Sequence, residues 1–303
     1  MAVVKRADLP GGARHRLRSA VPAIAFLLPA LLGLAAFRLW PVLSALDASL
    51  YDVNLISTKR TFVGLGNYLR AFQDPELLTS VRVTIIYAVA KVSLQVAGGL
   101  ALAVLVNRAG RAIWLVRSIL FLPVVTSLVV ASTLWLLILQ PDQGLLNGLL
   151  SSVHLPRQPF LRDAGQALPS IIAMMTWKDV GLSMLFFLAG LQGIPAMYYE
   201  AARMDGAGAW QRFRHVTLPL LRGTLLFVLV IETVFALRVF APIYVMTQGG
   251  PRGATPVIVF QIYEQAFPLN SFGYASALSV LLLFSIVVIT AILRRFVGAA
   301  VRY

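Results

Sequence analysis

Ionisable residues interrupt the long apolar stretches of this chain, where a charge is costly and therefore indicates a function. These residues are Arg38, Lys91, Lys178, Asp179, Glu232 and Arg238. Lys178 and Glu232 fall near the middle of two different stretches, so we predict an ion pair between them that orders the wall of a cavity. Lys178 and Asp179 are neighbours that diverge by ~100° around a helix, which argues against a pair between these two.

The distribution of polar residues argues against catalysis. An enzyme within a membrane would need a Ser/His/Asp set, paired carboxylates or a metal site at one depth. The three histidines, His15, His154 and His215, lie in separate polar segments, and we interpret the acidic residues of the apolar stretches as isolated from one another. The chain has no cysteine, which excludes disulfides, cysteine zinc sites and iron–sulfur clusters. We therefore expect neither an enzyme nor a metal site.

The composition is that of a membrane protein. Of the 303 residues, 59% are hydrophobic and only 13% are charged, and the mean hydropathy is +0.81, outside the range of soluble domains. Apolar runs long enough to cross a bilayer predict six transmembrane helices, at about 21–43, 80–106, 113–139, 167–191, 219–246 and 273–293. The first run exceeds the ~7–15 apolar residues of a signal peptide, so we expect it to be retained.

Positive charge sets the predicted orientation. The net charge is +14, and lysine and arginine mark the cytoplasmic ends of membrane spans. The N-terminal tail, the second and fourth connections and the C-terminus carry the excess of these residues. We therefore predict a single membrane domain over 21–296 between cytoplasmic tails at 1–20 and 297–303, with lipid and not nucleic acid as its surroundings.

A polar loop that begins at Glu200 and ends at Pro219 interrupts the apolar sequence on the predicted cytoplasmic side. Glu200–Met204 predicts a short helix, residues 205–208 a glycine turn, and Ala209–His215 a second helix. Such an element can present small residues to a groove of a soluble partner. The alternative is an amphipathic segment that rests on lipid headgroups.

This loop resembles the coupling loop of the permease subunits of binding-protein-dependent ABC importers. That family has Glu-Ala-Ala, three residues, Gly, nine residues and Ile-x-Leu-Pro, and only Val216 departs from the pattern. The resemblance implies an all-α permease of the type I importer fold, in the bacterial cytoplasmic membrane, with a coupling loop over 196–219. The residues that it assigns to ATPase coupling are Glu200, Ala201, Ala202, Asp205, Gly206, Ala207, Leu218 and Pro219.

Four further blocks look like the carbohydrate and glycerol-phosphate branch of that family. They are 62–68 (FVGLGNY), 117–123 (RSILFLP), 188–195 (LAGLQGIP) and 247–251 (TQGGP). Alone, the blocks at 62–68 and 247–251 read more simply as loop turns, but the four blocks occur together and in order. The resemblance implies three partners: a cytoplasmic ATPase dimer, a second related permease and an external solute-binding protein. The chain has no Gly-x-x-x-x-Gly-Lys-Ser/Thr loop, so we expect ATP and Mg²⁺ to be used by the ATPase, with no cofactor bound here.

The solute is predicted from the residues expected to line the pathway. They are Trp177, Lys178, Asp179, Glu232, Phe235, Arg238 and Tyr244, whereas Arg38 and Lys91 are interpreted as structural. The excess of cations over Asp179 and Glu232 suits a phosphate, and Arg238 departs from the uncharged residue usual in the family. We expect glycerol 3-phosphate or a glycerophosphodiester, with trehalose or maltose as the alternative. A secondary transporter that needs no ATPase is a further rival.

Overall fold

The computed structural model describes residues 26–54, 60–108 and 110–298, and these are largely helical. Four helices are long and apolar enough to cross a membrane: Phe26–Ala48, which contains η1 (Ala35–Leu39) and α2 (Trp40–Ala48), then α4 (Pro75–Val106), α8 (Ala164–Gln192) and α15 (Phe272–Gly298). These helices coincide with four of the six predicted spans. The predicted tail at 1–20 lies outside the described residues, as do residues 299–303 of the predicted tail at 297–303, whose first two residues belong to α15.

The two remaining predicted spans, at 113–139 and 219–246, are interrupted, and each contains a bend between two helices. The first consists of α5 (Arg111–Val125) and α6 (Leu128–Ile138), bent by 97°. The second has α10 (Ala209–Arg212), η3 (Phe213–Thr217) and α11 (Leu218–Leu220), a bend of 67° to α12 (Arg222–Leu237), and a separate α13 (Ala241–Met246). The described part of the chain thus has up to six spans if each bent pair is counted as one.

Proline stands at or near each interruption. Pro123 lies in the last turn of α5, and Thr126 beyond it is extended, with ψ 146°. The 67° bend falls at Leu221, two residues after Pro219 of α11, and Pro242 stands at the start of α13, where its ring nitrogen has no N–H to donate. Apolar composition alone indicates only that such segments prefer lipid or a protein interior, so it located both spans without revealing their bends.

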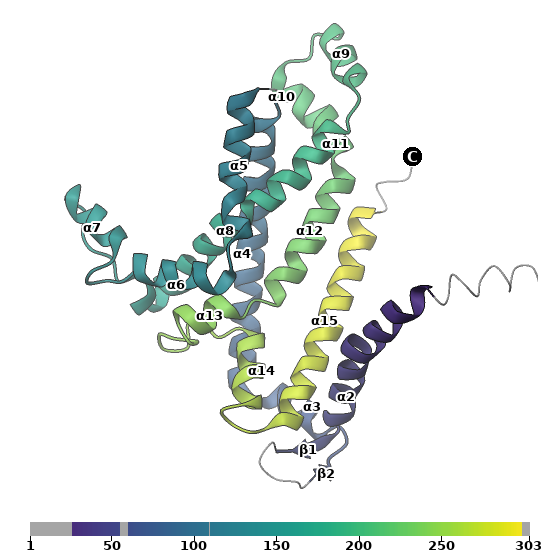
Figure 1. Ribbon diagram of the computed structural model, residues 1–303, viewed down its shortest axis with the longest axis vertical. Coiled ribbons are helices and arrows are strands. Elements are labelled where there is room, and N and C mark those ends of the chain that lie inside the picture. Colours follow the sequence, from purple (N-terminus) through teal and green to yellow (C-terminus); the bar gives the residue numbers. More distant parts are fainter. Residues whose placement is uncertain (1–25, 55–59, 109, 299–303) are drawn as a thin grey trace, which may run out of the picture.

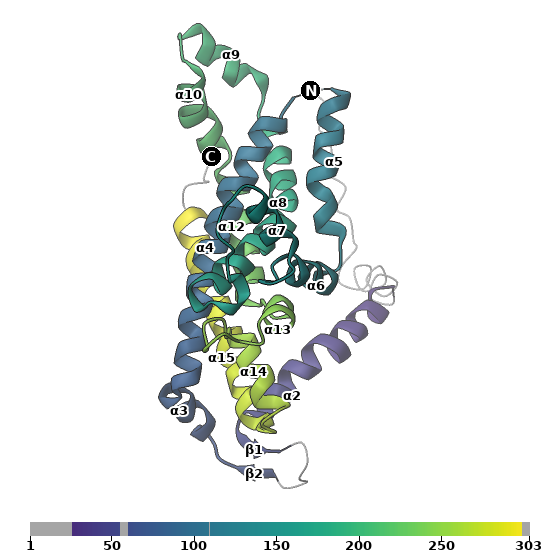
Figure 2. The same cartoon turned by 90° about the vertical axis from the view of Figure 1, so that its left-hand side faces the viewer.

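The long helices run between two ends of the molecule (Figures 1 and 2). One end carries α9 (Ala196–Met204) beyond α10. The other carries α3 (Gly66–Gln73) and a hairpin of β1 (Tyr51–Val53) and β2 (Arg60–Phe62), in which Tyr51 is opposite Phe62. The remaining elements are α7 (Leu145–Ser152), η2 (Phe160–Arg162) and α14 (Ile258–Ala266). The two short strands were not expected in an all-α protein.

The FVGLGNY block fastens this hairpin to the end of the first helix. The Asn67 side-chain amide donates to the carbonyls of Ser49 and Tyr51 at 2.9 and 3.0 Å, and the Tyr68 hydroxyl lies 2.7 Å from the Ser49 hydroxyl. Gly64 has φ +55°, which favours glycine. The block is therefore a turn whose side chains bond to the preceding helix.

Helix α8 is at the centre of the fold and packs closely on α4 and α5. A Cβ atom on Gly99 of α4 would lie 2.7 Å from the Ser183 side chain of α8, and one on Gly181 of α8 would lie 2.3 Å from the Leu120 carbonyl oxygen of α5. The largest buried cluster joins α4 and α8 to the end of α12, and includes Tyr87. Glycine lets these backbones approach, as is usual between helices in membranes.

Polar groups secure the helix ends. The Asp74 carboxylate accepts from the backbone N–H groups of Glu76 and Leu77 at the start of α4, and from the Tyr274 hydroxyl of α15 at 2.7 Å. At the other end of α4, Arg117 donates to the Val106 carbonyl at 2.6 Å. This contact explains the arginine at the start of the RSILFLP block, because a cation is favourable at a helix C-terminus.

Gly181→Ala should destabilise the fold. The added methyl group meets a backbone oxygen of α5, which cannot rotate away, and such overpacking costs ~1–3 kcal/mol. We expect a lower midpoint of thermal unfolding for the detergent-solubilised protein. Gly223→Ala in α12 is the matched control, because its Cβ would have no atom within 4 Å. Equal midpoints for the two variants would contradict the close approach of α8 and α5.

Candidate functional site

The polar loop folds as a helix, a glycine turn and a second helix, as the sequence predicted. Helix α9 ends in a Schellman motif: the Ala207 N–H donates to the Ala202 carbonyl at 2.9 Å and the Gly206 N–H to the Arg203 carbonyl at 3.0 Å. Gly206 has φ +75°, which an L-residue adopts only with strain. Glycine is therefore favoured at position 206 because of the backbone conformation of the turn.

The return segment of the loop is held by three side chains. Gln211 accepts from the Gly208 N–H at 2.7 Å, Arg212 donates to the Ala207 carbonyl at 2.7 Å, and the Tyr199 hydroxyl lies 3.1 Å from that of Thr217. The second helix changes from α10 to the π-helical η3 before Pro219. These bonds connect α9 to the segment that leads into α12, so the loop has a defined shape.

The residues assigned to coupling divide into an exposed and a half-buried group. Glu200, Ala201, Asp205 and Gly206 are exposed, whereas Ala202, Ala207, Leu218 and Pro219 are partly buried. The surface also exposes large apolar side chains that sequence reasoning missed: Met197 is 67% exposed, Met204 89% and Trp210 68%. Apolar residues exposed on a polar element indicate a contact surface. Large apolar residues within an otherwise polar loop were the sequence signal that could have indicated this contact surface.

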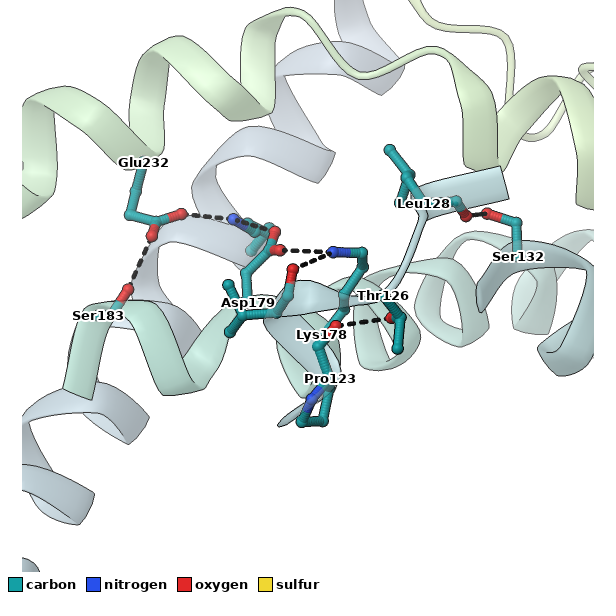
Figure 3. Close-up of polar contacts among 10 residues, drawn as sticks. Pro123, Thr126, Leu128, Ser132, Lys178, Asp179, Ser183 and Glu232 are labelled. Atoms are coloured by element: carbon teal, nitrogen blue, oxygen red, sulfur yellow. Dashed lines mark hydrogen bonds and ion pairs between the residues drawn. The ribbon is translucent and has the colours of Figure 1, made fainter. Parts of the chain in front are cut away.

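A second candidate site lies inside the helical bundle, where one ammonium contacts two carboxylates (Figure 3). The Lys91 Nζ of α4 lies 2.5 Å from Glu232 Oε2 of α12 and 3.3 Å from Asp179 Oδ2 of α8. The Ser183 hydroxyl donates to Glu232 Oε1 at 2.7 Å. Lys91 and Glu232 are both fully buried. Removing one partner of such a buried pair costs ~3–5 kcal/mol, because the other charge is left uncompensated.

This geometry corrects the predicted ion pair between Lys178 and Glu232. Glu232 instead pairs with Lys91, which the sequence placed at a helix contact, and Lys178 Nζ lies 3.8 Å from Asp179 Oδ1. The side chains of Lys178 and Asp179 are long enough to meet despite their divergence around α8. The two acidic residues were also wrongly interpreted as isolated, since both contact the same ammonium.

The cluster also removes much of the predicted cationic excess. Lys91 and Lys178 are balanced by Asp179 and Glu232 within ion-pair distance. Lys178 additionally donates to the Val124 carbonyl at the end of α5, at 3.3 Å. The buried charges therefore join helices, and the argument for a phosphate rests on Arg238, which is exposed and forms no ion pair within the described part of the chain.

The exposed pathway candidates are Trp177, Phe235, Arg238 and Tyr244. An aromatic group forms around Tyr244: the Phe240 ring stacks on it at 5.4 Å, and the Tyr263 ring of α14, which sequence reasoning missed, lies 5.2 Å from it. Phe235, which was also predicted to line the pathway, has no ring contact with this group among the described residues. Trp177 instead lies 5.5 Å from Trp135 of α6.

The TQGGP block borders a polar cleft of about 500 Å³ between the start of α4, the loop after α13, and α14. Gly249 has φ +79°, and a Cβ there would lie 2.8 Å from the Phe260 ring, so the block brings backbone close to α14. Burial and the nearby Glu76 raise the pKa of Glu264, which also lines the cleft. Among the residues that the structure describes, no three histidine or acidic side chains gather as metal ligands.

Sequence comparison identifies a family for most of the chain. Residues 95–303 match the family model described as "Binding-protein-dependent transport system inner membrane component". The sn-glycerol-3-phosphate transport system permease protein UgpA of Brucella abortus biovar 1 (strain 9-941) is 35% identical over 278 residues, or 91% of this chain and 94% of that protein. The probable ABC transporter permease protein YurN of Bacillus subtilis (strain 168) is 36% identical, over 85% of this chain and 89% of its own length.

The fold also matches a solved structure. One chain of a bacterial alginate ABC transporter, in complex with an alginate pentasaccharide-bound periplasmic protein, superposes with a TM-score of 0.83, over 93% of this chain and 96% of that one. The identity is 23%, so this likeness shows the fold alone. The expected helical fold of an ABC transporter permease is confirmed.

Gly206→Pro should open the end of α9. Proline cannot adopt φ +75° and has no N–H for the Arg203 carbonyl, and each ~1 kcal/mol lost from a local opening exposes the chain about fivefold more often. We expect trypsin to cleave after Arg203 several times faster than in the wild type. Gly208→Ala is the control, because Gly208 has φ −66° and ordinary space around it. Unchanged cleavage in Gly206→Pro would contradict the Schellman motif.

Proposed function

This chain belongs to the family of binding-protein-dependent transport system inner membrane components, and we propose that it forms one of the two membrane-spanning halves of an ATP-driven importer. It is a multi-pass inner-membrane permease for solutes of the sugar or glycerol-phosphate type. The observation that carries the proposal is the loop from Ala196 to Pro219, a hydrogen-bonded element with exposed methionines and tryptophan beyond the end of the bundle (Figure 1).

In the proposed mechanism this loop docks on a cytoplasmic ATPase. The exposed Glu200 anchors it at the rim of the partner's groove, and Ala201 offers a small contact surface. Gly206 forms the turn, and Pro219 begins the segment that leads into α12. The partner binds ATP and Mg²⁺ and closes, which moves the loops of both permeases together and opens the spans to an external binding protein. Hydrolysis then returns them to the inward-open state.

For the solute we propose glycerol 3-phosphate or a glycerophosphodiester. A relative named for sn-glycerol-3-phosphate transport matches 91% of the chain. Arg238 lies at the end of α12, exposed beside the break before α13, where a guanidinium can bind a phosphate through two parallel hydrogen bonds. An oligosaccharide such as trehalose or maltose is the second candidate, because the rings of Phe240, Tyr244 and Tyr263 could pack against a sugar.

Glu200→Lys should abolish copurification of the ATPase with the tagged permease. Charge reversal at the rim of the groove places a lysine against a partner surface that is complementary to a carboxylate, and such like-charge juxtaposition costs several kcal/mol. The matched control is Asp52→Lys, an exposed acidic residue in β1 at the opposite end of the molecule. Full retention of the ATPase by Glu200→Lys would refute the docking role. Full uptake in cells that lack the ATPase would instead support the secondary-transporter alternative.

Arg238→Gln should raise the solute concentration for half-maximal glycerol 3-phosphate uptake about 10- to 100-fold, the effect of losing a charged hydrogen bond worth ~1.5–3 kcal/mol. Uptake of radiolabelled solutes by a deletion strain carrying each variant measures this. For Arg238→Lys this concentration should lie between those of Arg238→Gln and the wild type, since lysine keeps the charge but lacks the paired donors of arginine. Wild-type uptake of trehalose or maltose with none of glycerol 3-phosphate would favour the second candidate.

A further inference from the structure

A continuous set of polar contacts joins α12 to the break between α5 and α6. It runs from Glu232 of α12 to Lys91 of α4 at 2.5 Å, from Lys91 to Asp179 of α8 at 3.3 Å, and from Asp179 to the adjacent Lys178 at 3.8 Å. Lys178 then donates to the Val124 carbonyl at 3.3 Å, one residue before α5 ends. Figure 3 labels Glu232, Asp179 and Lys178 of this set, together with Thr126 at the break. We call Glu232, Lys91, Asp179 and Lys178 the charge chain.

One end of the charge chain lies on the helix that follows the proposed coupling loop. The loop leads through η3 and α11 into α12, after a bend of 67°. Glu232 lies in the second half of α12 and is fully buried. Its two oxygens contact Lys91 of α4 and Ser183 of α8. A displacement of α12 relative to either helix would leave a carboxylate unpaired away from water, which is strongly unfavourable.

The other end of the charge chain contacts a backbone carbonyl in the last turn of α5. The last carbonyls of a helix lack intrahelical donors, and at the end of α5 the chain leaves the helical conformation. Within the described residues, the Lys178 ammonium supplies a side-chain donor to the Val124 carbonyl, and its charge is favourable at a helix C-terminus. The position of the break is therefore tied to α8 through Lys178.

We propose that the charge chain is a positioning device that fixes α12 to the α5–α6 break, so that a movement of the coupling loop displaces this break together with α12. The inference rests on the proposed function, because it assigns a role in the transport cycle to charged residues that join the helices. Lys91 and Lys178 are positioning residues in this account. The bent pair of α5 and α6 is the element that moves.

The most specific test removes only the contacts of Lys178 with Asp179 and the Val124 carbonyl. Lys178→Met keeps Lys91 between Asp179 and Glu232, so the principal buried pair stays intact and the protein should fold. In proteoliposomes with the whole importer, we expect the number of solute molecules imported per ATP hydrolysed to fall at least about fivefold, the lower end of typical coupling between sites. Lys178→Arg should restore most of this ratio. Gln95→Leu is the control: Gln95 is fully buried one turn from Lys91, and its amide has no hydrogen-bond partner in the described structure.

A distance measurement distinguishes positioning from a general loss of stability. The chain has no cysteine, so spin labels can be attached at Phe227 of α12 and Val125 at the end of α5, which are 49% and 73% exposed. In the otherwise wild-type importer the distance between the labels should stay constant when the ATPase binds ATP. In Lys178→Met it should change, because α12 then moves without the break.

The possible outcomes separate this inference from the proposed function. A wild-type complex that imports no solute with ATP would refute the proposed function and the positioning role together. Wild-type import with an unchanged solute-to-ATP ratio in Lys178→Met would refute the positioning role alone. A wild-type distance between Phe227 and Val125 that changes with ATP would refute it as well, whereas a constant distance that becomes variable in Lys178→Met supports it.

Discussion

A single buried ammonium determines how the central helices of this permease fit together. Lys91 of α4 is fully buried, and its charge is compensated by Glu232 of α12 at 2.5 Å and Asp179 of α8 at 3.3 Å. In a bilayer the alternative to this pairing is a charge in hydrocarbon. The three helices therefore have one favourable arrangement, and the glycines that bring α4 and α8 together, such as Gly99, make the short distances of that arrangement possible.

The same requirement for partners governs the backbone where spans are interrupted. Within a membrane, broken helices persist only if the freed carbonyls and N–H groups find other partners. At the break between α5 and α6, Lys178 of α8 provides a donor to the Val124 carbonyl. The same requirement applies at the ends of unbroken helices, where Arg117 provides a donor at the end of α4 and the backbone bonds of the Schellman motif satisfy the end of α9.

The sequence predicted what depends on local composition. Apolar length located the spans, and the glycine and proline spacing of the Glu200–Pro219 loop predicted its two helices, because a Schellman turn depends on a few adjacent residues. The pairing of charges depends on which helices are neighbours, and apolar stretches do not reveal this. Glu232 was therefore assigned to Lys178, when α4 brings Lys91 closer. The bend at Thr126 was missed although Pro123 was visible, because membrane helices often tolerate proline.

Pairing of the buried charges also limits which residues of this chain are available to bind the solute. If Lys91 and Lys178 are engaged with Asp179 and Glu232, they cannot also bind a passing phosphate without breaking contacts that join four helices. Recognition then falls to groups at the surface of this half, of which Arg238 has the appropriate charge and exposure. Arg238 lies six residues beyond Glu232, outside the regular part of α12. Helix α12 is thus held in the bundle through Glu232 and ends in the exposed guanidinium of Arg238. The residue that positions the helix and the residue proposed to bind solute are therefore different residues of the same segment.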